Sequence, residues 1–135
     1  IDPGMVLANE AISWLGKDAS PLNLAPKEVS CAEAMSNIIH QTYPHFPKNI
    51  LSTAAIFEEL KKSPHFKGVL NPKVGTVVVS PRTQTVNGHV GIYIKPDSIA
   101  SNGRDGLFWE NYTRESWRAE FIRGRGLKGY FFVPI

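Results

Sequence analysis

The segment SCAEAMSNII, residues 30–39, combines an apolar stripe with a helix-start signal. Ser30 and Glu33 fit the capping box S-x-x-E, which predicts Ser30 as the N-cap and Glu33 as the third helical residue. Pro44 ends the predicted helix. Positions i, i+3, i+4, i+7 and i+8 are apolar, the spacing of a helix with one buried face: Cys31, Ala34, Met35, Ile38 and Ile39.

Working outward from this helix, the sequence predicts helices first and strands afterwards. Further helices are expected at residues 5–15 and 52–62, and a short one within residues 113–121. From Gly75 onward, β-branched and aromatic residues alternate between turn signals. This order predicts an α+β fold with N-terminal helices packed on an antiparallel sheet. The expected strands are residues 76–79, 88–95, 97–102, 107–112 and 130–133.

Length and composition limit the class of protein further. The chain has 135 residues and one cysteine, with 15 Lys and Arg against 12 Asp and Glu. We expect one domain over residues 5–135, with residues 1–4 (Ile-Asp-Pro-Gly) as an expression scar. We find no signal peptide, and no apolar run predicts membrane insertion. The lone cysteine excludes an internal disulfide and a multi-cysteine zinc site, so no metal or other cofactor is expected. The mildly basic charge favours anionic partners.

Cys31 is the candidate nucleophile because the capping box places it at the first helical position. Free N–H groups and the positive end of the helix dipole favour an anion there. The sequence therefore predicts a thiol pKa below the ordinary value of about 8.5 and a thiolate near neutral pH. The alternative interpretation is a cysteine that serves as a small buried hydrophobe.

His89 is the candidate base because it opens the alternating strand Gly88–Lys95. His89, Gly91 and Tyr93 are predicted to share one face of the sheet, where the imidazole would meet a helix packed across it. A cysteine–histidine pair needs a third group that orients the imidazole. Asn102 on the following strand is the expected orienting residue, with Ser101 as the alternative.

These residues resemble the papain-like cell-wall hydrolases, namely the NlpC-type peptidases and the CHAP group (cysteine, histidine-dependent amidohydrolase/peptidases). The resemblance runs from about Ser13 to Trp117 and includes small phage-borne and bacterial members. Residues 29–33 (VSCAE) resemble the nucleophile segment, residues 88–92 (GHVGI) the general-base motif, and residues 99–102 (IASN) the strand of the third residue. Ala100 stands where CHAP members often carry a glutamate, which leaves Asn102 and Ser101 both open as the third residue.

The resemblance implies a papain-like fold and hydrolysis of an amide bond in peptidoglycan or its stem peptides, as an endopeptidase or amidase without a cofactor. Cys31 would attack the carbonyl, His89 would move the proton and Asn102 would orient the ring. Ser30 and Glu33 would support the helix start, where the Cys31 backbone N–H is a candidate oxyanion donor.

Three alternatives remain open from the sequence. The same catalytic groups would serve a toxin-like deamidase or acyltransferase. A non-catalytic cell-wall-binding module could use Trp109 and Tyr112, which are also candidate substrate contacts in the enzyme. Nucleic-acid binding is a minor alternative, because a basic cluster of the size seen near Arg123 and Arg125 is more typical of a solvated face. The oligomeric state is not predicted.

Overall fold

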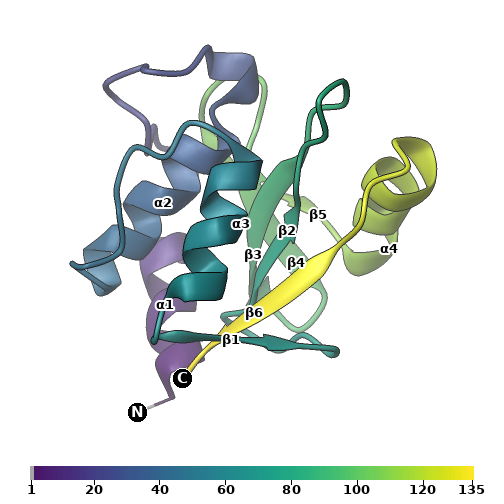
Figure 1. Ribbon diagram of the computed structural model, residues 1–135. Helices are drawn as coiled ribbons and strands as arrows, with labels where there is room; N and C mark the ends of the chain where they lie inside the picture. Colours follow the sequence, from purple (N-terminus) through teal and green to yellow (C-terminus); the bar gives the residue numbers. More distant parts are fainter. Residues whose placement is uncertain (1) are drawn as a thin grey trace.

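Helices occupy most of the N-terminal half of the chain in the computed structural model, which describes residues 2–135 (Figure 1). A 3-10 turn, η1 (Lys27–Val29), leads directly into the second helix. The buried residues of that helix include all five of the predicted apolar stripe. The helices of this half are α1 (Pro3–Ile12), α2 (Cys31–Thr42) and α3 (Thr53–Lys62).

Helix α1 begins at Pro3, two residues earlier than the sequence predicts. Asp2 is the N-cap, and its carboxylate accepts a hydrogen bond from the Gly4 N–H at 2.9 Å. Pro3 occupies the first helical position, where its missing N–H costs nothing. Gly4 is buried against Val74 and Gly75. Residues 2–4 therefore belong to the folded structure, and Ile1 lies outside the described residues.

The C-terminal half forms an antiparallel sheet in the order β1-β6-β2-β3-β4-β5. The expected strands all form, and the α+β prediction is confirmed. The sequence analysis missed β1, a four-residue edge strand that contains a glycine and has two exposed residues. The strands are β1 (Phe66–Val69), β2 (Val77–Ser80), β3 (His89–Lys95), β4 (Ser98–Asn102), β5 (Phe108–Tyr112) and β6 (Tyr130–Pro134).

The two faces of the sheet are covered by different helices, as Figure 1 shows. Val90 and Ile92 of β3 belong to the larger core together with residues of α1, α2 and α3. Tyr93 of the same strand belongs to a second core on the other face, with Trp117 and Phe121. Those two residues come from α4 (Arg114–Trp117) and from η2 (Arg118–Gly124), a π-helix that continues it. Side chains that alternate along a strand produce this division.

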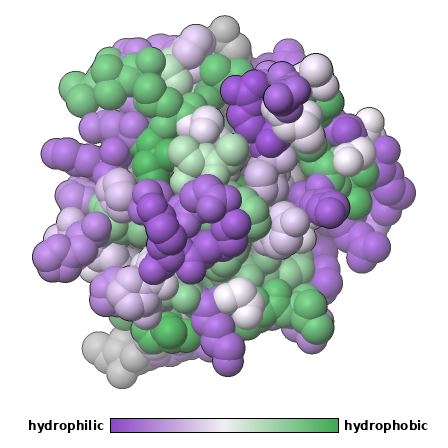
Figure 2. Space-filling model, in the orientation of Figure 1, coloured by the Kyte–Doolittle hydropathy of each residue, from purple (hydrophilic) through white to green (hydrophobic). Residues whose placement is uncertain are grey.

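The surface is mixed in polarity on the face drawn in Figure 2. Hydrophilic side chains separate the hydrophobic ones over much of this face. Such a mixture is ordinary for a folded domain, because polar groups are too few to cover a protein surface completely. No helix among residues 2–135 combines the length and the apolar character needed to cross a membrane.

Replacing Gly75 by alanine tests the packing of the N-terminal residues. Gly75 has a φ of +92°, and a Cβ there would lie 2.1 Å from the Gly4 carbonyl oxygen. Gly126 is a matched control, since its φ is +71° and a Cβ would meet no heavy atom within 4 Å. We expect Gly75→Ala to lower the free energy of unfolding by about 3 kcal/mol or more and Gly126→Ala by about 1 kcal/mol, measured by urea denaturation. Equal losses would contradict this packing.

Candidate active site

Ser30 is the N-cap of α2 and Glu33 is its third residue, as predicted, but the hydrogen bonds of the predicted capping box do not form. Ser30 has φ −90° and ψ 14°, and its side chain makes no capping hydrogen bond. The turn η1 directs the Ser30 hydroxyl backward, where it donates to the Lys27 carbonyl oxygen at 2.8 Å. The first N–H groups of α2 are therefore left without a side-chain cap, at the point where Cys31 begins the helix.

The Glu33 side chain binds the loop before α2 and does not cap the helix. Its fully buried carboxylate accepts hydrogen bonds from the backbone N–H groups of Ala25 at 2.9 Å and Leu24 at 3.3 Å. These bonds tie the preceding loop to the first turn of α2. Glu33 is not among the residues that line the pocket around Cys31.

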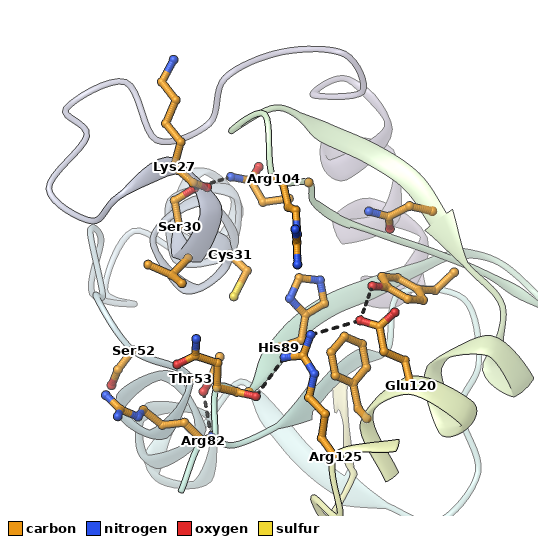
Figure 3. Close-up of a pocket in the computed structure, with 18 of the residues that line it drawn as sticks. Lys27, Ser30, Cys31, Ser52, Thr53, Arg82, His89, Arg104, Glu120 and Arg125 are labelled. Atoms are coloured by element: carbon orange, nitrogen blue, oxygen red, sulfur yellow. Dashed lines mark hydrogen bonds and ion pairs between the residues drawn. The ribbon is translucent and has the colours of Figure 1, made fainter. Parts of the chain in front are cut away.

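Cys31 and His89 line one pocket of about 460 Å³, and Figure 3 shows the sulfur and the imidazole in the same part of it. Cys31 is 8% exposed. The backbone N–H of Val90, the residue that follows His89, lies near enough to the Cys31 thiol to lower its pKa. The N-terminus of α2 thus meets the first residues of β3, and this contact brings the candidate nucleophile beside the candidate base.

His89 reaches the pocket by a different route from the one predicted. Its face of β3 packs against α4 and η2, and not against α2. The imidazole stacks on Phe121, with ring centroids 5.0 Å apart and planes 18° apart, and it also contacts Trp117 at 5.3 Å. Because His89 is the first residue of the strand, its ring lies at the end of the sheet, where the pocket opens. The aromatic rings hold it in place there.

Ser101 contacts the imidazole, in the place expected of an orienting residue. The Ser101 Oγ lies 2.8 Å from His89 Nε2, and its hydroxyl donates to Asn111 Oδ1 at 2.8 Å. Asn111 is held in turn, because its Nδ2 donates to the Ser101 carbonyl oxygen. With the hydroxyl hydrogen committed to Asn111, Ser101 accepts from Nε2–H. The neutral imidazole therefore keeps its lone pair on Nδ1, the nitrogen available to accept the thiol proton.

Asn102, the residue expected to orient His89, makes a different contact. Its Nδ2 donates to Ser30 Oγ at 2.8 Å and so joins β4 to the start of α2. Successive residues of a strand point to opposite faces, so Ser101 and Asn102 cannot both face His89. Asn102 still lines the pocket, and its buried Oδ1 has no hydrogen-bond partner among the described residues.

Burial opposes the predicted thiolate. It raises the pKa of the Cys31 thiol to about 11, against the lowering effect of the Val90, Ala32 and Cys31 N–H groups and of the Arg125 charge. Burial, with a smaller effect from Arg125, lowers the pKa of the His89 imidazole to about 3. The expected thiol pKa below 8.5 is contradicted. Without substrate, both groups are neutral at pH 7.

Of the two candidate substrate contacts, Tyr112 lies in the pocket and Trp109 lies outside it. Tyr112 lines the pocket, packs edge-on against His89 and donates to Glu120 at 3.0 Å. Burial and the nearby Glu120 carboxylate together raise the pKa of the Tyr112 phenol to about 12. Trp109 is not among the pocket-lining residues, and its indole N–H is bound by Asp105.

Several site residues escaped the sequence analysis. Phe121 and Glu120 come from the π-helix η2, whose period differs from the 3.6 residues by which helices are recognised. Asn111 lies on β5, two residues beyond Trp109, the register partner of Ser101. A diagonal neighbour of this kind becomes visible only once the strand register is known. Among residues 2–135, no cluster of three or more His, Cys, Asp or Glu side chains is placed to hold a metal ion.

The fold and the site define an α+β protein whose cysteine, histidine and serine side chains meet at one end of a sheet. Its fold is similar to that of a chain in a type VI native effector–immunity complex, Tae3–Tai3 from Ralstonia pickettii. The TM-score is 0.61, the sequence identity is 16%, and the match covers 98% of each chain. At this identity the likeness shows the fold alone. No protein-family model matches the sequence, and no curated protein matches it either.

Alkylation of the single cysteine tests the protonation state of the site. Because burial raises the thiol pKa to about 11, we expect the iodoacetamide rate of the folded protein still to be rising at about pH 10. The urea-unfolded protein is the control and should show a midpoint of about 8.5. A folded-state midpoint below that of the unfolded protein would show that the site stabilises the thiolate.

Proposed function

We propose that this chain is a cysteine-dependent hydrolase that cleaves an amide bond in peptidoglycan. The observation that carries the proposal is the shared pocket of Cys31 and His89, in which the far nitrogen of the imidazole is fixed by Ser101. Nucleophile, base and orienting group form the set that acyl transfer requires. The fold is similar to that of a chain in an effector–immunity complex, and the pocket of Cys31 and His89 favours the effector role, because an immunity protein needs a matching surface and no nucleophile.

The neutral resting state favours a general-base mechanism. As the Cys31 sulfur attacks the amide carbonyl, His89 Nδ1 accepts the thiol proton. The Cys31 backbone N–H, at the start of α2, is a candidate donor to the tetrahedral oxyanion. The imidazolium then protonates the leaving amine, and the carbon–nitrogen bond breaks to leave a thioester. A water molecule, deprotonated by His89, attacks the thioester, and the thiol is regenerated with release of the carboxylate product.

Ser101 acts through His89 in this mechanism. It accepts Nε2–H, keeps the lone pair on Nδ1 and stabilises the imidazolium while it exists. Phe121 contributes orientation by stacking on the ring. Tyr112, held by Glu120 and lying at the pocket wall, is a substrate-contact candidate because it combines an aromatic face with a fixed hydroxyl.

The first test compares wild-type protein with Cys31→Ala on purified peptidoglycan. The wild type is expected to release soluble fragments, and mass spectrometry of their new termini identifies the bond that is cut. Cys31→Ala and His89→Gln should release none, while His45→Gln, an exposed histidine outside the pocket, should remain active. Release by Cys31→Ala equal to that of the wild type would refute the proposal. Binding without release by the wild type would indicate a wall-binding module.

The second test separates Ser101 from Asn102. Ser101→Ala removes the acceptor of Nε2–H, so we expect kcat to fall about 10- to 100-fold with little change in KM. Asn102→Ala removes a contact between β4 and Ser30 and should reduce kcat less. Steady-state kinetics on a defined wall fragment measure both variants. A larger loss of kcat in Asn102→Ala than in Ser101→Ala would contradict this assignment and indicate Asn102 as the orienting residue.

A further inference from the structure

The pocket around Cys31 is strongly cationic for a protein of modest net charge. Four basic side chains line it: Lys27, Arg82, Arg104 and Arg125. Glu120 is the one acidic residue among the described pocket-lining residues. A concave surface lined by one sign of charge concentrates ligands of the opposite sign. This distribution indicates an anionic ligand.

Two of these cations lie nearest the reacting groups, and they differ in their partners. The Arg125 guanidinium is bound by the Asn87 carbonyl oxygen at 3.1 Å and by the Glu120 carboxylate at 3.3 Å. Arg104 makes no hydrogen bond or ion pair with the described part of the chain, and Figure 3 shows its guanidinium pointing toward His89. Lys27 and Arg82 lie farther out in this view. Arg104 is thus the free cation nearest the site.

The loop that carries Arg104 is well fixed. Gly103 N–H donates to the Leu107 carbonyl oxygen at 2.8 Å, which closes the loop between β4 and β5. The Asp105 carboxylate accepts from the Leu107 N–H at 3.0 Å and from the Trp109 indole at 2.9 Å. Such a loop holds the Arg104 backbone in place, so that its side chain is presented to the pocket at a small entropic cost.

We propose that Arg104 binds a free carboxylate of the substrate beside the scissile amide, so that the enzyme prefers acidic peptides. This inference rests on the proposed function and names its substrate class. A planar guanidinium with five N–H donors matches a carboxylate in bidentate geometry, which an ammonium group cannot do. Lys27 and Arg82 at the rim attract the anionic peptide, and Arg104 fixes its register against Cys31.

A carboxylate in this position would also assist the chemistry. The Arg125 charge contributes to the low pKa of the His89 imidazole. A substrate carboxylate placed among the cations offsets that charge and favours the imidazolium that forms during attack. His89 thereby becomes a better base when an acidic substrate is bound, which would give an acidic peptide a higher kcat as well as a lower KM.

The test uses two synthetic stem peptides that differ at one position, a free carboxylate in one and a carboxamide in the other. Binding to Cys31→Ala protein is measured by calorimetry, and cleavage by the wild type is measured by mass spectrometry. We expect the acid to bind about tenfold more tightly than the amide. In Arg104→Gln this preference should fall to about twofold or less. Arg118→Gln is the matched control, since Arg118 does not line this pocket, and it should keep the preference.

The outcomes separate this inference from the proposed function. Equal binding of acid and amide, no binding of either, or an unchanged preference in Arg104→Gln would overturn the role of Arg104. If the acid binds preferentially but the wild type cleaves neither peptide nor peptidoglycan, the carboxylate site stands and the hydrolase proposal fails. Cleavage of both peptides at equal rates and equal KM would leave the hydrolase and overturn the substrate preference.

Discussion

The contact between the first turn of α2 and the first residues of β3 is the interaction on which the site depends. Cys31 at the start of α2 and Val90 at the start of β3 belong to one buried core, and the Val90 backbone N–H lies near enough to the Cys31 thiol to lower its pKa. The buried stripe of α2 and the inward residues of β3 belong to one core, which fixes the helix on the sheet. His89 is the first residue of β3, and its ring lines the pocket at that end of the sheet.

Different parts of the chain stabilise the two reacting groups. Cys31 belongs to the core between the sheet and helices α1, α2 and α3, whereas His89 contacts Phe121 and Trp117 on the opposite face. Ser101 on β4 supplies the polar contact that fixes the ring nitrogen. The alignment of the pair therefore depends on both cores at once. A substitution of Phe121 in η2 would therefore change the support of the imidazole without touching α2.

Much of this could be predicted from the sequence where a pattern reports directly on burial. The stripe of α2 and the alternation of β3 gave the helix, the strand and the candidate pair Cys31 and His89. The predicted capping-box hydrogen bonds do not form, because the same four residues also suit a helix preceded by a 3-10 turn. Only the backbone angles at Ser30 distinguish the two arrangements. The choice between Ser101 and Asn102 required the strand face. The thiol pKa was wrong because the local effect of a helix start is visible in sequence and the depth of burial is not.

Cys31 and His89 are both uncharged at neutral pH, because both side chains are buried. Burial disfavours both the thiolate and the imidazolium, and in the proposed mechanism charge separation would therefore be confined to the moment of attack, when Ser101 would stabilise the imidazolium. The pKa of His89 is lower in the folded protein than its value of about 6.5 in the unfolded chain. The folded protein therefore loses stability as the pH falls from about 6.5 toward the folded-state pKa. The same burial that keeps the imidazole neutral therefore also makes the fold sensitive to acid.

Nitrogen-15 NMR titration of the His89 ring, before and after alkylation of Cys31, directly tests whether the two side chains form a neutral, adjacent pair. We expect a neutral imidazole with its proton on Nε2 from neutral pH down to about pH 4, and a clear change in the Nδ1 resonance when Cys31 is alkylated. A His89 ring that titrates near 6.5 and whose nitrogen resonances ignore the modification of Cys31 would contradict it.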